Sequence, residues 1–288
     1  MIYKNMIKVN NTYLNVYFEG KGNLTIVFMA GSGVTAPVLE YKPLYRRMSD
    51  SYKIAVVEKS GYGFSGSMTT ERTVENLVNE SREALKKAGL QPPYVLAPHS
   101  YSGIEAIWWA NNYPEEIKAI LGIDMVFPNM ALAQAKEISE DKKVKMVIQQ
   151  RKFLSIIARQ GLISKLFKNQ TINISGLMTG NELSTDEKVL YQKLFYKNIL
   201  NKEVSEESVL ATANAEKADK SGIIKCPACF YISNMKSPVK AITWQKAGIA
   251  YAKKCGGEYH LSKAGHTLYA SIPDEIAETF KNFLKKLS

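Results

Sequence analysis

The chain has 288 residues, of which 45% are hydrophobic and 23% are charged. This composition is typical of a globular α/β protein and excludes a disordered chain, a collagen-like chain and a small disulfide-stabilised scaffold. Its apolar runs are far shorter than the ~18 residues that a membrane span needs. The first ten residues lack the apolar core of a signal peptide. We therefore predict a cytoplasmic protein without a membrane span and leave its oligomeric state open.

The net charge of +11 does not indicate a nucleic-acid partner. Residues 223–288 carry much of the excess, with 10 basic and 4 acidic side chains, and only six of the 38 basic residues are Arg. Arg supplies most bidentate contacts to phosphates and bases, so a solvated, lysine-rich surface explains the charge better. We predict no nucleic-acid binding.

The three cysteines form no complete metal or redox motif. Cys226 and Cys229 have the CxxC spacing, but no second pair or neighbouring His completes a zinc site. Their segment is typical of the entry into a buried strand, whereas a redox CxxC opens a helix. We expect Cys255 to be unpaired, and we predict neither a metal nor a cofactor.

In chain order, the hydrophobic pattern predicts strands that alternate with helices. Residues 6–20 alternate apolar and polar side chains around Asn10-Asn11, which predicts a hairpin. Short apolar runs typical of buried parallel strands follow, with helical patterns between several of them. The strands are expected at 24–30, 54–57, 94–97, 119–123, 228–232 and 259–261, and the helices at 71–88, at 103–112 and from Pro273 onward. This alternation predicts an α/β fold with a doubly wound, mostly parallel sheet.

Residues 127–222 interrupt the alternation. They contain helical patterns without a convincing strand, with one helix from about Asp141 to Arg159. Another helix opens at Ser184, where Glu187 completes a capping box. We therefore predict a sheet domain formed by residues 1–126 and 223–288, with a helical insertion at 127–222 after the sixth strand.

The segment YVLAPHSYSGIEAIWWA carries the strongest chemical signal. A strand ends, Ser100 stands at the bend, and a helix begins at once. This resembles the nucleophile elbow of the α/β-hydrolase fold, in which a strained turn exposes the serine oxygen above the sheet. Pro98 and Ser102 stand where that elbow usually has glycines.

Three further segments are similar to α/β-hydrolase motifs and occur in the same order. VVEKSGYGFSGS resembles the D-R-x-G-x-G-x-S segment with Glu58 in place of Asp, and LTIVFMAGSGV resembles the strand and turn of the oxyanion loop. LSKAGHTLYASIPDEIAETFKNFL resembles the terminal G-H-x-x-x-x-x-x-P-x-x-[IV] pattern. The resemblance covers the predicted sheet domain and implies that the insertion at 127–222 is a cap.

The resemblance also implies roles for individual residues. Ser100 would be the nucleophile of acyl transfer, and His266 its general base. His99 is expected to point to the other side of the turn, and His260 to lie in the last strand as a core or face residue. The backbone N–H groups of Ser32 and Tyr101 would form the oxyanion hole.

The acid that orients His266 is missing from its usual place, because no carboxylate follows the seventh predicted strand before Glu258. Asp124, at the end of the sixth strand, is the predicted acid and keeps the order Ser–acid–His. Alternatively, Asp124 only caps the start of the insertion. Asn234 and Glu58 are weaker candidates, because Asn234 has no charge and the family counterpart of Glu58 supports a neighbouring loop.

These residues predict a serine hydrolase that forms an acyl-enzyme with a small-molecule partner, most simply a small apolar carboxylic ester. Cap side chains are expected to roof an apolar pocket: Phe153, Phe167, Leu190 and Phe195. An amidase, an aminopeptidase and a lactonase are alternatives, and an aminopeptidase would need a cap acid for the substrate's ammonium group, such as Glu137, Glu140 or Glu182. A non-catalytic ligand-binding homologue is the alternative from another class.

Overall fold

The fold was analysed in a computed structural model that describes residues 3–137, 149, 175–199, 201–236 and 242–287. Apart from residue 149, the predicted helix at 141–159 lies outside these described residues, as do the side chains of Glu140, Phe153 and Phe167. Within them, no helix combines the length and the apolar character that crossing a bilayer requires.

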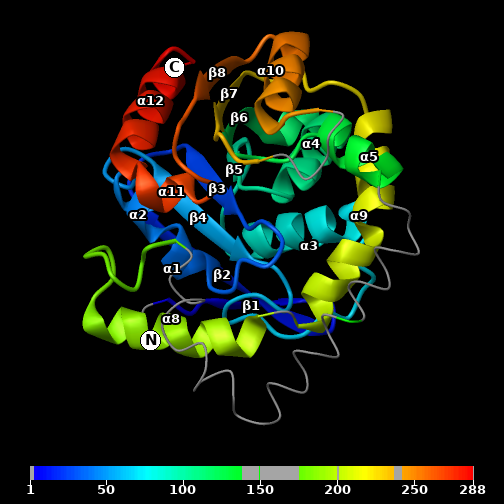
Figure 1. Cartoon of the computed structure of the whole chain (residues 1–288). Helices are drawn as coiled ribbons and strands as arrows, with labels where there is room; N and C mark the ends of the chain where they lie inside the picture. The colour runs from blue at the N-terminus through cyan, green and yellow to red at the C-terminus, as the bar shows by residue number, and fades with distance from the viewer. Residues whose placement is uncertain (1–2, 138–148, 150–174, 200, 237–241, 288) are drawn as a thin grey trace.

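An eight-stranded sheet with the order β1-β2-β4-β3-β5-β6-β7-β8 forms the centre of the molecule (Figure 1). The β1–β2 hairpin and the β2–β4 pair are antiparallel, and every other neighbouring pair is parallel. The predicted mostly parallel sheet is therefore confirmed. The strands are β1 (Met6–Val9), β2 (Thr12–Gly20), β3 (Thr25–Met29), β4 (Lys53–Glu58), β5 (Tyr94–Pro98), β6 (Ile117–Ile123), β7 (Ala228–Ile232) and β8 (Glu258–Leu261).

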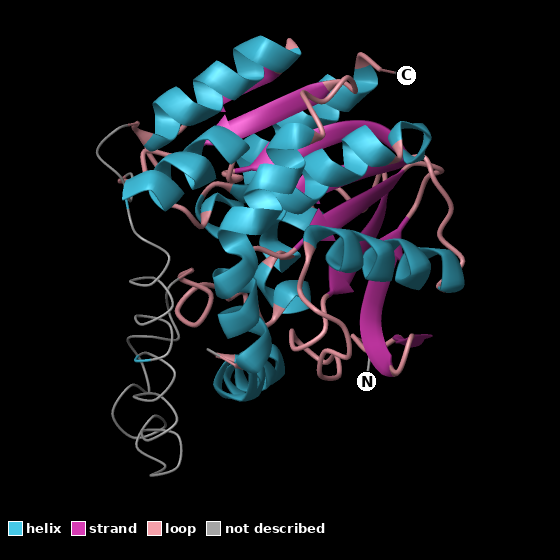
Figure 2. Ribbon diagram, turned by 90° about the vertical axis from the view of Figure 1, so that its right-hand side faces the viewer, coloured by secondary structure: helices cyan, strands magenta, loops and turns pink. Residues whose placement is uncertain are grey.

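Helices cover both faces of this sheet (Figure 2). Strand β3 is buried along its whole length, with Val27 and Met29 packed on one face and Ile26 and Phe28 on the other. This two-sided burial explains why the strand is continuously apolar. The first face is covered mainly by α3 (Val74–Lys87), α4 (Ser102–Asn112) and α10 (Trp244–Cys255), and the second by α1 (Pro37–Glu40), α2 (Lys42–Arg46) and α12 (Pro273–Lys285).

Local signals set the ends of several helices. Thr73 caps α3 by accepting the Asn76 N–H. Helix α12 opens with Pro273, whose fixed φ suits a first helical position, and buries one apolar side. Two short helices complete this part of the chain: η1 (Pro114–Glu116) and α11 (Leu268–Ser271).

Between β6 and β7 the structure describes α5 (Pro128–Glu137), α8 (Thr185–Asn198) and α9 (Lys202–Lys220). The predicted capping box is present, because Glu187 N donates to Ser184 Oγ and Ser184 N donates to Glu187 Oε2. Helix α8 packs apolar side chains, including Leu194, against Leu39 of α1. Helix α9 packs against α5 and α4 (Figure 1).

Candidate active site

The turn between β5 and α4 holds Ser100 in a left-handed conformation with φ of 54°, a strained value for a residue with a side chain. Gly31 lies directly against it: a Cβ at Gly31 would stand 2.7 Å from Ser100 Cβ. Ser102, in place of the usual glycine, accepts the His99 N–H at 3.0 Å, and its hydroxyl lies 2.9 Å from the Met29 carbonyl oxygen. The atypical Ser102 therefore ties the turn to β3.

Ser100, His266 and Asp124 form one hydrogen-bonded row. His266 Nε2 lies 2.9 Å from Ser100 Oγ, and His266 Nδ1 lies 2.6 Å from Asp124 Oδ2. Asp124 follows β6 with φ of 47° and is 1% exposed, whereas His266 is partly exposed. The structure thus brings together three residues that stand far apart in the chain, in the geometry that nucleophile, base and orienting acid require.

Two residues without a sequence signal hold the Asp124 carboxylate. Ser233 donates its backbone N–H to Oδ1 and its hydroxyl to Oδ2, both at 2.7 Å, and Trp244 Nε1 donates to Oδ1 at 2.6 Å. The fold thus brings the Trp244 indole, from the start of α10, to the acid.

The two weaker acid candidates lie elsewhere. Asn234 is exposed. Glu58 is fully buried and accepts hydrogen bonds from Asn15 Nδ2, Phe64 N and Val38 N. Burial raises the pKa of Glu58 to about 7, although these donors act in the opposite direction. Glu58 therefore ties loops together, and it makes no contact with His266 among those of the described residues.

His99 packs against His266 instead of pointing away as we expected. The two rings lie 4.7 Å apart, and His99 Nε2 lies 3.1 Å from the His266 carbonyl oxygen. Burial, together with His266, lowers the pKa of His99 to about 3, so the ring is neutral. A carbonyl only accepts, so Nε2 carries the proton and Nδ1 is left to accept from Tyr41 Oη at 3.4 Å. His260 stacks on Tyr231 in the β7–β8 pair.

Two tyrosines hold the turn that follows β3. Gly31 N donates to Tyr41 Oη at 3.3 Å, and Gly33 N donates to Tyr62 Oη at 3.2 Å. The Ser32 amide stands between these two and, like the Tyr101 amide, has no acceptor among the described residues. These are the two backbone N–H groups that we predicted for the oxyanion hole. The clamping role of the tyrosines had no signal in the sequence.

A pocket of about 150 Å³ opens at Ser100 and His266. The prediction of an apolar pocket roofed by cap phenylalanines was only partly correct, because Phe195 and Tyr191 of α8 line it but Glu40, Thr35 and Ser175 line it as well. Leu190, of the same helix, packs beside the α1–α8 cluster and is absent from the lining. A larger pocket, of about 550 Å³, lies near Pro93 and Lys118, at the opposite ends of β5 and β6.

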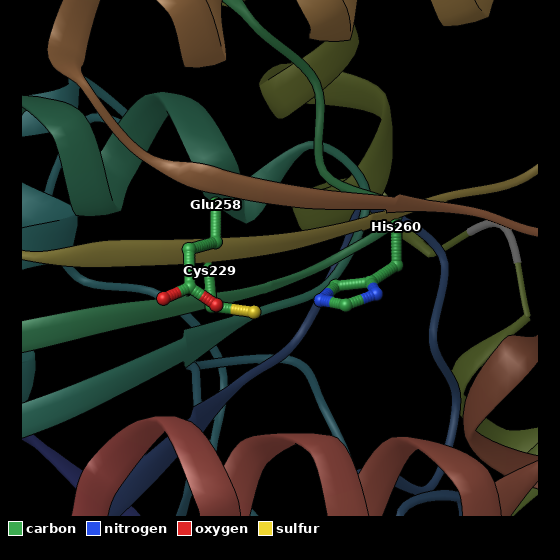
Figure 3. Close-up of side chains that lie close together, drawn as sticks. All are labelled: Cys229, Glu258 and His260. Carbon is green, nitrogen blue, oxygen red and sulfur yellow. The ribbon is translucent and has the colours of Figure 1, made fainter. Parts of the chain in front are cut away.

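Away from the pocket at Ser100, three side chains of β7 and β8 point the same way: Cys229, Glu258 and His260 (Figure 3). Their potential metal-ligand atoms lie within 4.8 Å of one another. The sequence did not indicate this cluster, because the pairing of β7 with β8 brings the three residues together. Lys286 Nζ already pairs with Glu258 at 2.9 Å, and burial raises the pKa of the Cys229 thiol to about 12. All three cysteines are free.

No family model matches the chain. The uncharacterised protein YbdG of Bacillus subtilis is 31% identical over 297 residues, which cover 98% of this chain and 86% of YbdG. Among solved structures, an esterase from Thermogutta terrifontis matches with a TM-score of 0.68 and 16% identity, over 98% of this chain and 99% of its own. The enol-lactonase of Burkholderia xenovorans matches with a TM-score of 0.63 and 15% identity, over 98% of this chain and 100% of its own. The chain therefore has the α/β-hydrolase fold and belongs to the family of YbdG.

Proposed function

We propose that this protein is a serine hydrolase that cleaves small carboxylic esters through an acyl-enzyme. The observation that carries the proposal is the hydrogen-bonded row from Ser100 through His266 to Asp124. One fold supports several reactions, so the α/β-hydrolase fold alone does not decide the reaction.

In the proposed mechanism, Ser100 Oγ attacks the ester carbonyl carbon while His266 Nε2 takes the hydroxyl proton. Asp124 accepts the hydrogen bond from Nδ1–H, which fixes the tautomer and stabilises the imidazolium that forms. The Ser32 and Tyr101 amides donate to the oxyanion of the tetrahedral intermediate. His266 then protonates the departing alcohol, and water attacks the acyl-enzyme with His266 again acting as the base.

The proposed substrates are small because the pocket at Ser100 is small. Pockets for drug-sized ligands span roughly 300–1,000 Å³, whereas this one has about 150 Å³. Helix α8 contributes Tyr191 and Phe195 to its wall. This supports the proposal that the insertion at 127–222 acts as a cap over the sheet domain.

A fluorophosphonate probe tests the nucleophile. We expect one label per chain and a burst of p-nitrophenol from p-nitrophenyl acetate followed by steady turnover. Ser100→Ala should abolish both signals, whereas Ser271→Ala, an exposed serine on α11, should keep both. Labelling that persists in Ser100→Ala would assign the reaction to another serine. Binding of esters without turnover would favour a ligand-binding homologue.

A further inference from the structure

Glu40 places a buried carboxyl group in the wall of the pocket that contains Ser100 and His266. Its Oε1 accepts three hydrogen bonds, from Thr35 N at 3.0 Å, from Thr35 Oγ1 at 3.2 Å and from Ala36 N at 3.2 Å. Its Oε2 accepts one hydrogen bond from the described residues, donated by Tyr269 Oη at 3.2 Å. Each carboxylate oxygen accepts about two hydrogen bonds, so Oε2 has capacity for a further donor.

No described cation neutralises Glu40. The basic side chains of the adjoining segment are engaged elsewhere, because Lys42 pairs with Glu187 and Arg47 pairs with Glu182 and Asp274. A buried carboxylate without a counter-ion is costly, and burial accordingly raises the pKa of Glu40. A positively charged ligand group would supply the missing partner.

Ser175 provides a second, independent observation in the same pocket. Its hydroxyl is buried near Tyr191 and makes no hydrogen bond of regular geometry with the described residues. It lines the pocket together with Glu40. The wall therefore offers one oxygen with spare acceptor capacity and one hydroxyl without a regular partner among the described residues, which suits a group with several N–H donors.

We propose that Glu40 is a specificity-determining residue that binds a primary ammonium group in the acyl part of the substrate, with Ser175 accepting a second N–H from the same group. An ammonium has three donors, enough for Glu40 Oε2 and Ser175 Oγ together. A cavity of about 150 Å³ holds a molecule of roughly the size of benzene. The substrates are accordingly esters of the smallest amino acids. This inference rests on the proposed function of Ser100.

A matched pair of esters tests the inference. Ethyl glycinate and ethyl propanoate differ by an ammonium in place of a methyl group of similar size. The measured quantity is the ratio of their kcat/KM values at pH 6.5, compared between the wild type and Glu40→Gln. Any loss of folded protein cancels within each ratio, because both esters are measured on the same enzyme. The intrinsic reactivities of the two esters contribute equally to the ratio of the wild type and to that of Glu40→Gln. We expect Glu40→Gln to lower the ratio at least tenfold, and a change of less than twofold would overturn the inference.

Glu182→Gln is the matched control, because this acid pairs with Arg47 and does not line the pocket. Its ratio should equal that of the wild type, and an equal fall in both variants would overturn the inference in favour of a long-range charge effect. Should Glu40→Gln fail to fold, inhibition of the wild type by small ligands tests the inference instead. We expect n-propylammonium to inhibit p-nitrophenyl acetate hydrolysis at least tenfold more strongly than 1-propanol does. Equal inhibition by the two would overturn the inference.

The two proposals fail in different ways. If ester turnover depends on Ser100 but the ratio of kcat/KM values is unchanged in Glu40→Gln, only the ammonium site is contradicted. Absence of Ser100 labelling and of all ester turnover contradicts the proposed function, and calorimetric titration with n-propylammonium then tests Glu40 directly. Heat of binding in the wild type that disappears in Glu40→Gln supports the ammonium site, and its absence from the wild type overturns it.

Discussion

Asp124 and Glu58 are two buried carboxylates at the same edge of the sheet, and they have different surroundings. Glu58 is the last residue of β4 and Asp124 directly follows β6. Glu58 is 0% exposed and Asp124 is 1% exposed. Asp124 contacts a titratable side chain, His266, whereas Glu58 contacts two backbone amides and the side-chain amide of Asn15. The two acids share their burial and their position at the sheet edge, so neither feature assigns a role to an acid. The comparison teaches that the group in contact with the carboxylate assigns that role.

The partners also show what each carboxylate positions. Glu58 joins α1, through Val38, to the loop after β4, through Phe64. Gly63 passes so close that an added Cβ would lie 2.1 Å from the Glu58 carboxylate. Glu58 therefore holds backbone segments together, whereas Asp124 contacts one imidazole ring.

The largest effect should come from Asp124→Asn. We expect kcat on p-nitrophenyl acetate to fall at least a hundredfold, and on the order of 10⁴ by analogy with serine proteases, because Asn cannot stabilise an imidazolium by charge. Circular dichroism should verify the fold. A mild phenotype here beside a severe loss in Asn234→Ala would overturn the assignment of the acid.

Trp244→Phe should have the next largest effect, a fall in kcat of about tenfold. The change removes the N–H donated to Asp124 Oδ1 and leaves the carboxylate with Ser233 and His266. Trp108→Phe, on the nearby helix α4, is the control for the loss of a buried ring and should keep kcat within about twofold. Equal losses in the two variants would mean that packing, not the hydrogen bond, is responsible.

Glu58→Gln should lower kcat less than about tenfold and should change how stability depends on pH. The folded pKa of about 7 lies above the ordinary value of 4.5. Between these values the folded state holds a proton that the unfolded state has lost, so the Glu58 contribution is complete below pH 4.5 and is lost as the pH rises to 7. The contribution is about 3 kcal/mol at most.

Urea unfolding at pH 4.5 and pH 7.5 measures this dependence. The free energy of unfolding of the wild type should fall, relative to that of Glu58→Gln, as the pH rises across this interval. A difference between the two proteins that is constant with pH would show that folding leaves the pKa of Glu58 unshifted.

Asn234→Ala should have the smallest effect, a loss in kcat of less than about tenfold. The side chain is exposed and lies one residue beyond the Ser233 amide that holds Asp124. Kinetics on p-nitrophenyl acetate check this, with Asp124→Asn measured in parallel. A loss of a hundredfold would restore Asn234 as the residue that orients His266.

Much of the fold was predictable because its signals are local. Continuous apolar runs marked strands such as β3, and the Ser184–Glu187 pair marked the start of α8. The candidate residues Ser100 and His266 were also within reach, since each stands in a short segment with a recognisable turn. Asp124 could be proposed only from its place at the end of the sixth strand and from the lack of a carboxylate after the seventh, because no motif surrounds it.

The sequence by itself determined the alternation of strands and helices, the strained turn at Ser100 and the candidates for its chemistry, since each depends on neighbours within a few residues. Only the tertiary structure decided that Ser233 and Trp244 hold Asp124, that Tyr41 and Tyr62 clamp the turn around Ser32, and that Glu40 enters the pocket. These contacts join segments from different strands and helices. Their effect depends on distance and desolvation, and both are set only when the chain folds.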